Sequence, residues 1–248
     1  MIEKELLDLL NSDVWPEAAP SFLICSDTDE DKFERAEGIL DYVGEELKDK
    51  KFLDFGCGEG HVAKKAIEMG SKAFGYDIVQ TGSLDWNSGL TTDWETIKVN
   101  GPYDFILLYD VLDHCIDPVL ALNQVKEVCG VDTKVFVRCH PFTSRHGGHL
   151  YKQMNKAFIH FIFNEEELNE LGLKADIVQK TYFPIKDNNK WFSGVGFNVI
   201  SQDTISGTVE QFFKDTQIIL NKLPLNFYKN NFPDWQMSQL FNDYILKL

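Results

Sequence analysis

The sequence predicts an α/β fold: a doubly wound, mostly parallel sheet of seven strands with a C-terminal antiparallel hairpin, and helices at both ends of the chain. Short apolar runs alternate with helical stretches from residue 51 onward, and a glycine-rich turn joins the first run to a helix. Two strand-like segments separated by a polar loop follow late in the chain. Strands that alternate with helices form βαβ units, whose right-handed crossovers produce a parallel sheet.

A chain of 248 residues is long enough for one domain with a large core. We expect a single domain with three parts: N-terminal helices and a lid over residues 1–50, a core over residues 51–201, and a C-terminal helical extension over residues 202–248. In the first part, helices are expected over residues 1–10 and 32–47. Between them, Pro16 and Pro20 interrupt a segment from Trp15 to Cys25 that is the candidate lid.

Five strands of the core are predicted from short apolar runs with strand-like composition. They are Phe52 to Phe55, Ala73 to Tyr76, Gly89 to Thr92, Tyr103 to Tyr109 and Lys134 to Cys139. The hairpin is predicted from Ala175 to Phe183 and from Trp191 to Ser201, around the polar loop 186–189. Further helices are expected over residues 150–163, 209–223 and 235–248.

Composition excludes several classes of partner. The formal net charge is -15, so the average surface repels nucleic acid and anionic lipid. No apolar stretch approaches the roughly 18 residues of a membrane span. The five cysteines are scattered and contain no CxxC pair, which indicates a reducing cytoplasm without structural zinc. We therefore expect a cytoplasmic protein with a small-molecule partner, and a homodimer is an open possibility for its C-terminal helices.

Residues 53–61 form the most informative motif. They read Leu-Asp-Phe-Gly-Cys-Gly-Glu-Gly-His and lie between a predicted strand and a predicted helix. Gly56, Gly58 and Gly60 allow a sharp turn and a close approach of a ligand, and the helix N-terminus offers unpaired N–H groups. A dinucleotide fingerprint requires a third glycine at position 61, where this chain has His61.

The pattern from Asp54 to Gly60 resembles the first motif of the class I S-adenosylmethionine-dependent methyltransferases of small-molecule type. The resemblance continues in Phe74-Gly75-Tyr76-Asp77-Ile78 and covers about residues 51–139. It implies a Rossmann-like methyltransferase fold with S-adenosylmethionine as cofactor. The cofactor-binding residues it implies are Asp54, Gly56, Cys57, Gly58, Gly60, His61, Asp77, Ile78, Asp93, Trp94 and Tyr109.

Within this resemblance, Asp77 binds the ribose hydroxyls and Ile78 packs on the adenine. Asp93 accepts a hydrogen bond from the adenine amino group, and Trp94 covers the ring. Asp93 is equally suited to cap a short helix that starts at Trp94. The chain departs from the family between its second and third strands, where the usual helix is shortened or absent. This departure bears on the placement of Asp93.

Methyl transfer from a sulfonium is a direct displacement, so a hydroxyl acceptor needs a base to remove its proton. His114 follows the fourth predicted strand, in a loop that resembles the histidine-bearing loop of small-molecule methyltransferases. The alternative is that His114 caps the next helix at Asp117-Pro118.

Residues 138–149 follow the fifth predicted strand and combine three histidines with two arginines. We expect this loop to bind a small polar or anionic acceptor, with His140 and His149 as catalytic candidates and Arg138, Arg145 and His146 as substrate-binding candidates. A solvated flexible loop is the alternative. His146 and His149, with His140 or His160, are also possible metal ligands, but their spacing matches no established zinc pattern and we expect no metal.

We therefore predict a methyltransferase that acts on oxygen or nitrogen of a small polar or anionic acceptor. The alternatives are a methyltransferase of protein side chains, a regulatory module that binds the cofactor without turnover, and a nicotinamide-dependent oxidoreductase on the same type of sheet.

Overall fold

The computed structural model describes residues 4–19, 28–174, 185–206 and 239–248. The chain forms two compact units, each made of segments that are distant in sequence. Unit 1 comprises residues 1–24, 140–185 and 204–242, and unit 2 comprises residues 25–139, 186–203 and 243–248. These boundaries do not coincide with the expected ones at residues 50 and 201, because the chain leaves unit 2 after residue 139 and returns to it twice.

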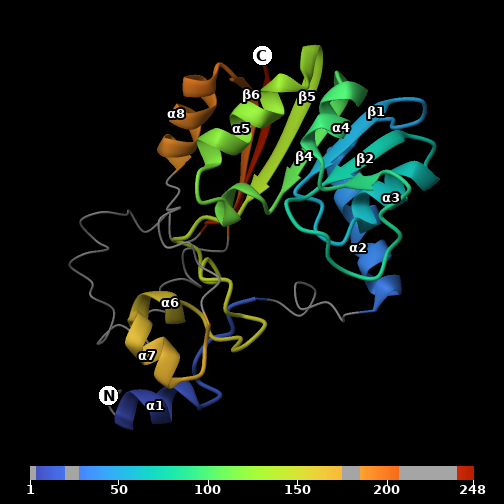
Figure 1. Ribbon diagram of the computed structural model, residues 1–248. Coiled ribbons are helices and arrows are strands. Elements are labelled where there is room, and N and C mark those ends of the chain that lie inside the picture. Colours follow the sequence, from blue (N-terminus) through green and yellow to red (C-terminus); the bar gives the residue numbers. More distant parts are fainter. Residues whose placement is uncertain (1–3, 20–27, 175–184, 207–238) are drawn as a thin grey trace. The chain divides into compact units, whose positions relative to one another are not determined.

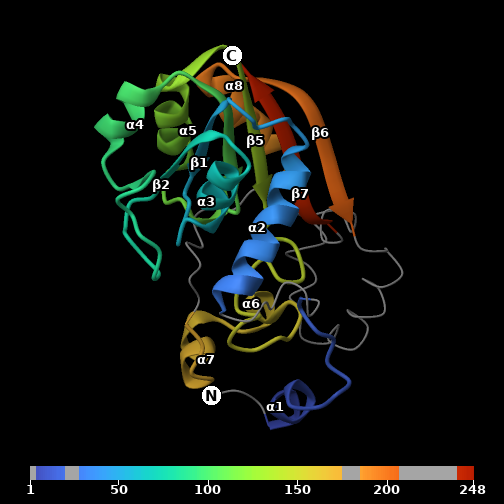
Figure 2. The same ribbon diagram turned by 90° about the vertical axis from the view of Figure 1, so that its right-hand side faces the viewer.

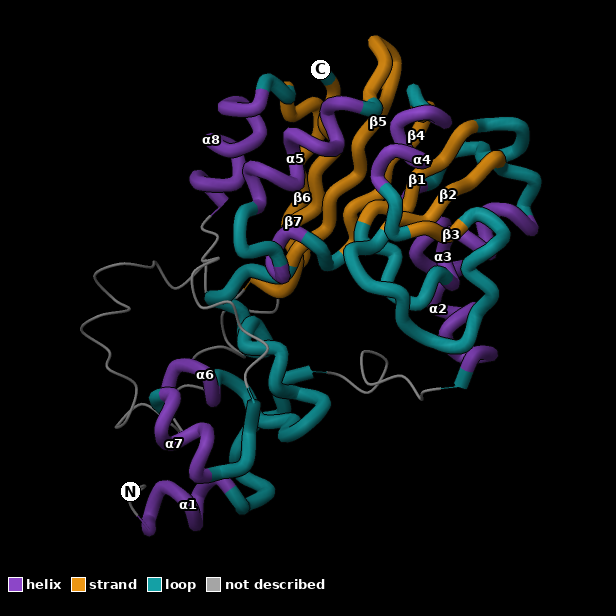
Figure 3. The backbone as a smooth tube through the Cα atoms, in the orientation of Figure 1, coloured by secondary structure: helices purple, strands orange, loops and turns teal. Residues whose placement is uncertain are grey.

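Unit 2 contains most of a seven-stranded sheet with the strand order β3-β2-β1-β4-β5-β7-β6 (Figures 1 and 3). The strands are β1 Lys51–Phe55, β2 Lys72–Tyr76, β3 Leu90–Thr91, β4 Tyr103–Tyr109, β5 Cys129–Cys139, β6 Asn198–Ser206 and β7 Gln239–Lys247. The pairings among β1 to β5 are parallel, and β6 and β7 supply the antiparallel C-terminal pair (Figure 2). The predicted fold class is therefore confirmed.

Helices cover both faces of this sheet (Figures 1 and 2). Those of unit 2 are α2 Asp29–Val43, α3 His61–Glu68, α4 Trp94–Asn100, α5 Pro118–Glu127 and α8 Ile185–Val195, with a 3-10 helix, η2, at Leu112–His114. Alternate residues of β4 face the two sides: Ile106 packs with α4, α5 and α8, whereas Leu107 packs with α2 and α3. This alternation follows from the period of two along a strand.

Helix boundaries follow local capping. Thr28 caps α2 by accepting a hydrogen bond from the backbone N–H of Asp31, and Gly44 ends the helix in a left-handed conformation. The helix therefore spans residues 29–43, earlier at both ends than the expected 32–47.

The sequence-based assignment of the C-terminal pair is wrong in detail. Residues 185–195, which include the expected polar loop and the start of the expected second strand, form α8, with Phe192 and Val195 buried three residues apart on one helical face. Residues 239–247, expected within a helix, form β7. Tyr244 and Leu246 are buried on alternate positions there, as a strand requires. The expected strand 175–183 and helix 209–223 lie outside the described residues.

The described residues of unit 1 form three short helices, α1 Lys4–Leu10, α6 Ile159–Ile162 and α7 Glu165–Glu170. The expected helix over residues 150–163 is wrong, since only α6 forms within it. Trp15 is 2% exposed and its indole N–H donates to the carbonyl of Ala157 at 3.0 Å. The amide of Asn155 bonds both the N–H and the carbonyl of Ala19. Residues 15–19 are thus part of the core of unit 1, and the rest of the expected lid, residues 20–25, lies outside the described residues.

No helix among the described residues is long and apolar enough to cross a membrane.

Arg138 ties β5 to β7. Its guanidinium donates to both carboxylate oxygens of Asp243, at 2.7 and 2.6 Å, and to the hydroxyl of Tyr109 at 3.1 Å. It also lies over the ring of Tyr42, 4.3 Å from the ring centroid. The bidentate pair uses the donors that would bind a substrate. We therefore correct the expected substrate-binding role of Arg138 to a structural one.

Replacing Arg138 by leucine should destabilise the fold by about 3–5 kcal/mol, because it leaves the Asp243 carboxylate largely buried without its partner. Lys134→Met is the matched control on the same strand. Its partner Glu45 forms a more exposed pair, so the loss there should stay below about 1 kcal/mol. Urea unfolding followed by circular dichroism measures both values. Equal losses in the two variants would contradict the structural role.

Candidate functional site

The carboxyl ends of β1, β2 and β4 meet at one edge of the sheet, because these strands are parallel neighbours. The loops that leave this edge surround a cavity of ≈ 620 Å³. It is lined by Phe55, Gly56, Tyr76, Asp77, Ile78, Asp110, Val111, His114, Cys115, Ile116, Asp117, Leu120, Ala121 and Gln124. Ligands of open α/β sheets bind in this position.

The glycine loop, residues 56–60, begins where β1 ends. The N–H groups of Gly56 and Cys57 both donate to the carbonyl of Tyr76, at 2.7 and 3.0 Å. Gly56, Gly58 and Gly60 have φ values of 79°, 54° and 91°, a region that residues with a side chain rarely adopt. A Cβ at Gly58 would meet no protein atom within 4 Å, so this face of the loop is open to a ligand.

Asp77 joins the second strand to the glycine loop. Its Oδ2 accepts a hydrogen bond from the N–H of Gly58 at 2.8 Å, and the residue lines the cavity. The next residue, Ile78, is 81% exposed although it also lines the cavity. An exposed aliphatic side chain beside a carboxylate is suited to a ligand that has an apolar ring and hydroxyl groups.

Asp54 is buried beneath the loop, at 3% exposure. Burial raises the pKa of its carboxyl to about 7; a hydrogen bond from the N–H of Ala63 opposes this shift, and the negative charge of Asp77 adds to it. Its Oδ2 has no hydrogen-bond partner within the part of the chain that the structure describes. A buried oxygen without a partner beside a ligand site can accept a hydrogen bond when a ligand binds.

Asp93 and Trp94 do not line the cavity directly. The carboxylate of Asp93 accepts hydrogen bonds from the backbone of Glu95 and from the backbone and hydroxyl of Thr96. Asp93 therefore caps α4, the alternative left open by the sequence. These bonds lower the pKa of its carboxyl. Trp94 packs edge-on against Phe55 and Tyr76, two residues of the cavity wall, and so supports that wall from behind.

Three other expected cofactor residues do not line the cavity. Tyr109 accepts the hydrogen bond from Arg138 described above. The ring of His61, at the start of α3, lies 3.1 Å from Asp29 Oδ1 and is 7% exposed. Cys57 is absent from the cavity wall. Burial raises the pKa of its thiol, so the thiol remains protonated.

His114 is exposed and lines the cavity. The helix after it, α5, is capped by Asp117, whose carboxylate accepts a hydrogen bond from the N–H of Leu120 at 3.0 Å. The alternative that His114 caps this helix is therefore wrong.

The histidine-rich loop belongs to unit 1. His140 Nδ1 lies 2.7 Å from His146 Nε2, and the rings of His140 and His149 have centroids 5.2 Å apart. His140 and His146 are 4% and 2% exposed, so the loop is not the solvated segment that the alternative required. Arg145 donates to the backbone carbonyl of Glu17.

His160 has a structural role beside this loop. Its Nε2 lies 2.9 Å from the carbonyl oxygen of Phe142, to which the ring N–H donates. Burial lowers the pKa of the imidazole to about 4, so the ring is neutral. A Cβ at Gly148 would lie 2.5 Å from the Cβ of His160, which explains why glycine is needed there.

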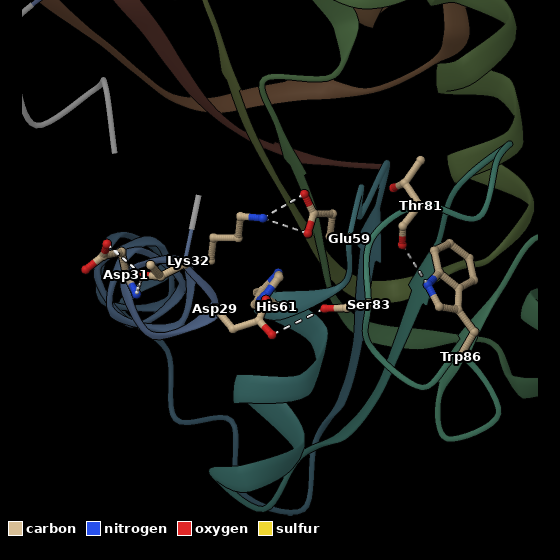
Figure 4. A network of polar contacts seen from close by, with 9 residues as sticks. Asp29, Asp31, Lys32, Glu59, His61, Thr81, Ser83 and Trp86 are labelled. Atoms are coloured by element: carbon tan, nitrogen blue, oxygen red, sulfur yellow. Dashed lines mark hydrogen bonds and ion pairs between the residues drawn. The ribbon is translucent and has the colours of Figure 1, made fainter. Parts of the chain in front are cut away.

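A polar network between the first turn of α2 and the glycine loop was not predicted from the sequence (Figure 4). Lys32 Nζ donates to both carboxylate oxygens of Glu59, at 2.9 and 2.8 Å. Asp29 contacts His61 and also accepts a hydrogen bond from Ser83 Oγ at 3.3 Å. Asp29, Glu59 and His61 are close enough to share a cation, but the Lys32 ammonium already neutralises Glu59.

Sequence reasoning also missed Asp110 in the cavity wall. It directly follows β4, at the same edge as Asp77, and the same rule could have identified it. Its left-handed backbone, with φ of 55°, is unusual for a residue with a side chain, and Arg35 lies 3.7 Å from its carboxylate.

Comparison with known proteins supports these observations. A family model described as a methyltransferase domain matches residues 29–202. A SAM-dependent methyltransferase from Archaeoglobus fulgidus is similar in structure, with a TM-score of 0.52 and 14% identity over 89% of this chain and 95% of that one. Magnesium protoporphyrin IX methyltransferase from Synechocystis, solved with bound SAH, has a TM-score of 0.50 and 12% identity over 98% and 94%. None of the curated proteins matches the sequence.

The buried carboxyl of Asp54 makes stability depend on pH. Because its pKa is raised in the folded state, the folded protein binds a proton that the unfolded chain releases between about pH 4 and pH 7, and stability falls as pH rises through this window. Asp54→Asn should remove this contribution and stabilise the ligand-free protein at pH 8 by up to roughly 4 kcal/mol. Urea titrations from pH 4 to 8 measure the difference. Parallel curves for variant and wild type would show that Asp54 is ionised throughout.

Proposed function

Because the chain belongs to the methyltransferase-domain family and uses S-adenosylmethionine, we propose that it methylates an oxygen or nitrogen atom of a small polar or anionic acceptor. The observation that carries the proposal is the cavity at the carboxyl edge of the sheet, bounded by Gly56, Asp77 and His114. The family match also confirms the resemblance to class I methyltransferases and excludes the nicotinamide alternative.

The residues at the cavity fit the cofactor. Asp77 is placed to accept hydrogen bonds from ribose hydroxyls, and Ile78 supplies an apolar surface for the adenine. The open face at Gly58 admits the ligand close to the backbone. The carboxylate of Asp77 in the cavity wall favours a cationic ligand. Trp94 packs against Phe55 and Tyr76 of the cavity wall. Cys57, Gly60 and His61 remain our candidates for shaping the glycine loop around the cofactor.

When bound, S-adenosylmethionine supplies a methyl group activated by its sulfonium. The chain itself needs no covalent nucleophile, and its task is to orient the acceptor and to accept a proton. We assign proton removal to His114, since this imidazole lines the cavity and is exposed. His140 is less suited because it is buried against His146. His149 remains our second candidate for catalysis and Arg145 our candidate for holding the acceptor. His146 is less suited to hold it, because it is 2% exposed and lies against His140.

We also propose a cytoplasmic location. Cys57, Cys115 and Cys129 are free thiols among the described residues, as expected in a reducing compartment.

Gly58→Ala should weaken binding of S-adenosylmethionine and S-adenosylhomocysteine at least tenfold, because the added methyl group projects into the open face of the loop. Gly172→Ala is the matched control: Gly172 also has a positive φ, of 72°, and an open surrounding, but it follows α7 in unit 1. Calorimetric titration measures both variants. Equal weakening in both would trace the effect to backbone strain, and tight binding of NAD by the wild type would overturn the cofactor assignment.

His114→Asn should lower kcat on a hydroxyl acceptor roughly 100-fold, because the acceptor proton loses its base. An acceptor screen with labelled S-adenosylmethionine identifies the substrate before this comparison is made. On an amine that is already deprotonated the loss should be much smaller. An unchanged kcat on a hydroxyl acceptor would rule out His114 as the base.

A further inference from the structure

The glycine loop has few restraints of its own. Glu59 lies between Gly58 and Gly60, and glycine gives up more backbone entropy on ordering than any other residue. Within the loop itself, the N–H of Gly60 donates to the carbonyl of Cys57 at 2.8 Å. A loop of this composition needs contacts from other segments to hold one conformation before a ligand arrives.

The first turn of α2 supplies a charged contact to the loop. Lys32 pairs with both oxygens of Glu59, and the two side chains are only 22% and 35% exposed. Partial burial reduces screening by water and salt, and the two donor contacts fix the direction of the Glu59 side chain. Lys32 itself is held in place because Thr28 caps this turn of the helix.

The first turn of α2 also contacts His61, the residue after the loop, and the segment 77–89. Asp29 contacts the ring of His61 with one carboxylate oxygen and accepts from Ser83 with the other (Figure 4). Ser83 lies in the segment 77–89, which begins at Asp77 and contains no helix. The ring of Phe33 packs edge-on against His61, with centroids 4.9 Å apart.

Glu59 and the segment 77–89 are in direct contact as well. A Cβ at Gly82 would lie 2.7 Å from both the Cγ and an oxygen of Glu59, so the carboxylate is seated against the backbone of Gly82. The first turn of α2, the glycine loop and the segment 77–89 therefore converge on Glu59 and Asp29. The last two of these segments also carry Gly58 and Asp77, which bond to each other at the cavity.

We propose that Lys32 and Asp29 are positioning residues for the cofactor, which hold the glycine loop in its binding conformation through Glu59 and His61. The inference rests on the cofactor site described above and extends it to a helix outside the motif. Neither Lys32 nor Asp29 lines the cavity. Their effect is therefore exerted through the conformation of the loop backbone, including the N–H of Gly58 that donates to Asp77.

Calorimetric titration of the full chain with S-adenosylhomocysteine tests this role. Lys32→Met should weaken binding roughly threefold to tenfold, since Glu59 loses its partner. Lys32→Arg should restore affinity to within about twofold of the wild type. Lys65→Met is the matched control. Lys65 of α3 pairs with Glu37 of α2 at 2.9 Å and does not contact the loop. The affinity of this variant for S-adenosylhomocysteine should stay at the wild-type value.

Hydrogen exchange of residues 56–61 separates positioning from a general loss of stability. Without ligand, these amides should exchange faster in Lys32→Met than in Lys65→Met, and saturating ligand should remove the difference. Wild-type affinity in Lys32→Met, or unchanged exchange of the loop, would overturn the proposal. Tighter binding by the wild type in the presence of Mn²⁺ than with EDTA would also overturn it, because a metal would then hold the acidic side chains. Failure of the wild type to bind at all would instead overturn the cofactor site.

Discussion

The backbone carbonyl of Tyr76 accepts hydrogen bonds from both Gly56 and Cys57, and the geometry of the site depends on this contact. It requires β1 and β2 to be parallel neighbours in the observed register, in which Phe55 lies beside Tyr76. A slip of one residue would exchange the two faces of β2 and move Asp77 away from the N–H of Gly58. The packed core on both faces of the sheet therefore determines where the ligand-binding groups stand.

Much of this arrangement could be predicted because the signals are local. A strand, three alternating glycines and a helix occupy consecutive residues, and the strand that ends at Asp77 follows closely. The carboxyl edge of a parallel sheet then brings these segments together without any further information. Strand β4 was predicted with its observed bounds, since it contains the continuous apolar run Phe105 to Tyr109 that parallel strands favour.

The wrong assignments of helix and strand arose where a short hydrophobic pattern is compatible with both the helical and the strand period. Residues 235–248 contain enough leucine and aromatic side chains to suggest a helix, yet Tyr244 and Leu246 alternate with Asp243 and Lys247, which is the period of a strand. In α8 the reverse happened, because aromatic residues raise strand propensity while Phe192 and Val195 keep helical spacing. Arg138 illustrates a different limit. Its partner, Asp243, is 105 residues away, so no local pattern could show that the guanidinium is already engaged.

The short third strand has a consequence for how the molecule meets other copies of itself. With only Leu90 and Thr91, β3 closes one side of the sheet with two residues. Edge strands normally present a row of unpaired N–H and C=O groups with which another chain can pair, and this can lead to aggregation. An edge of two residues offers very few such groups. The segment before β3 therefore lacks the usual helix, and yet the sheet gains no long exposed edge on this side.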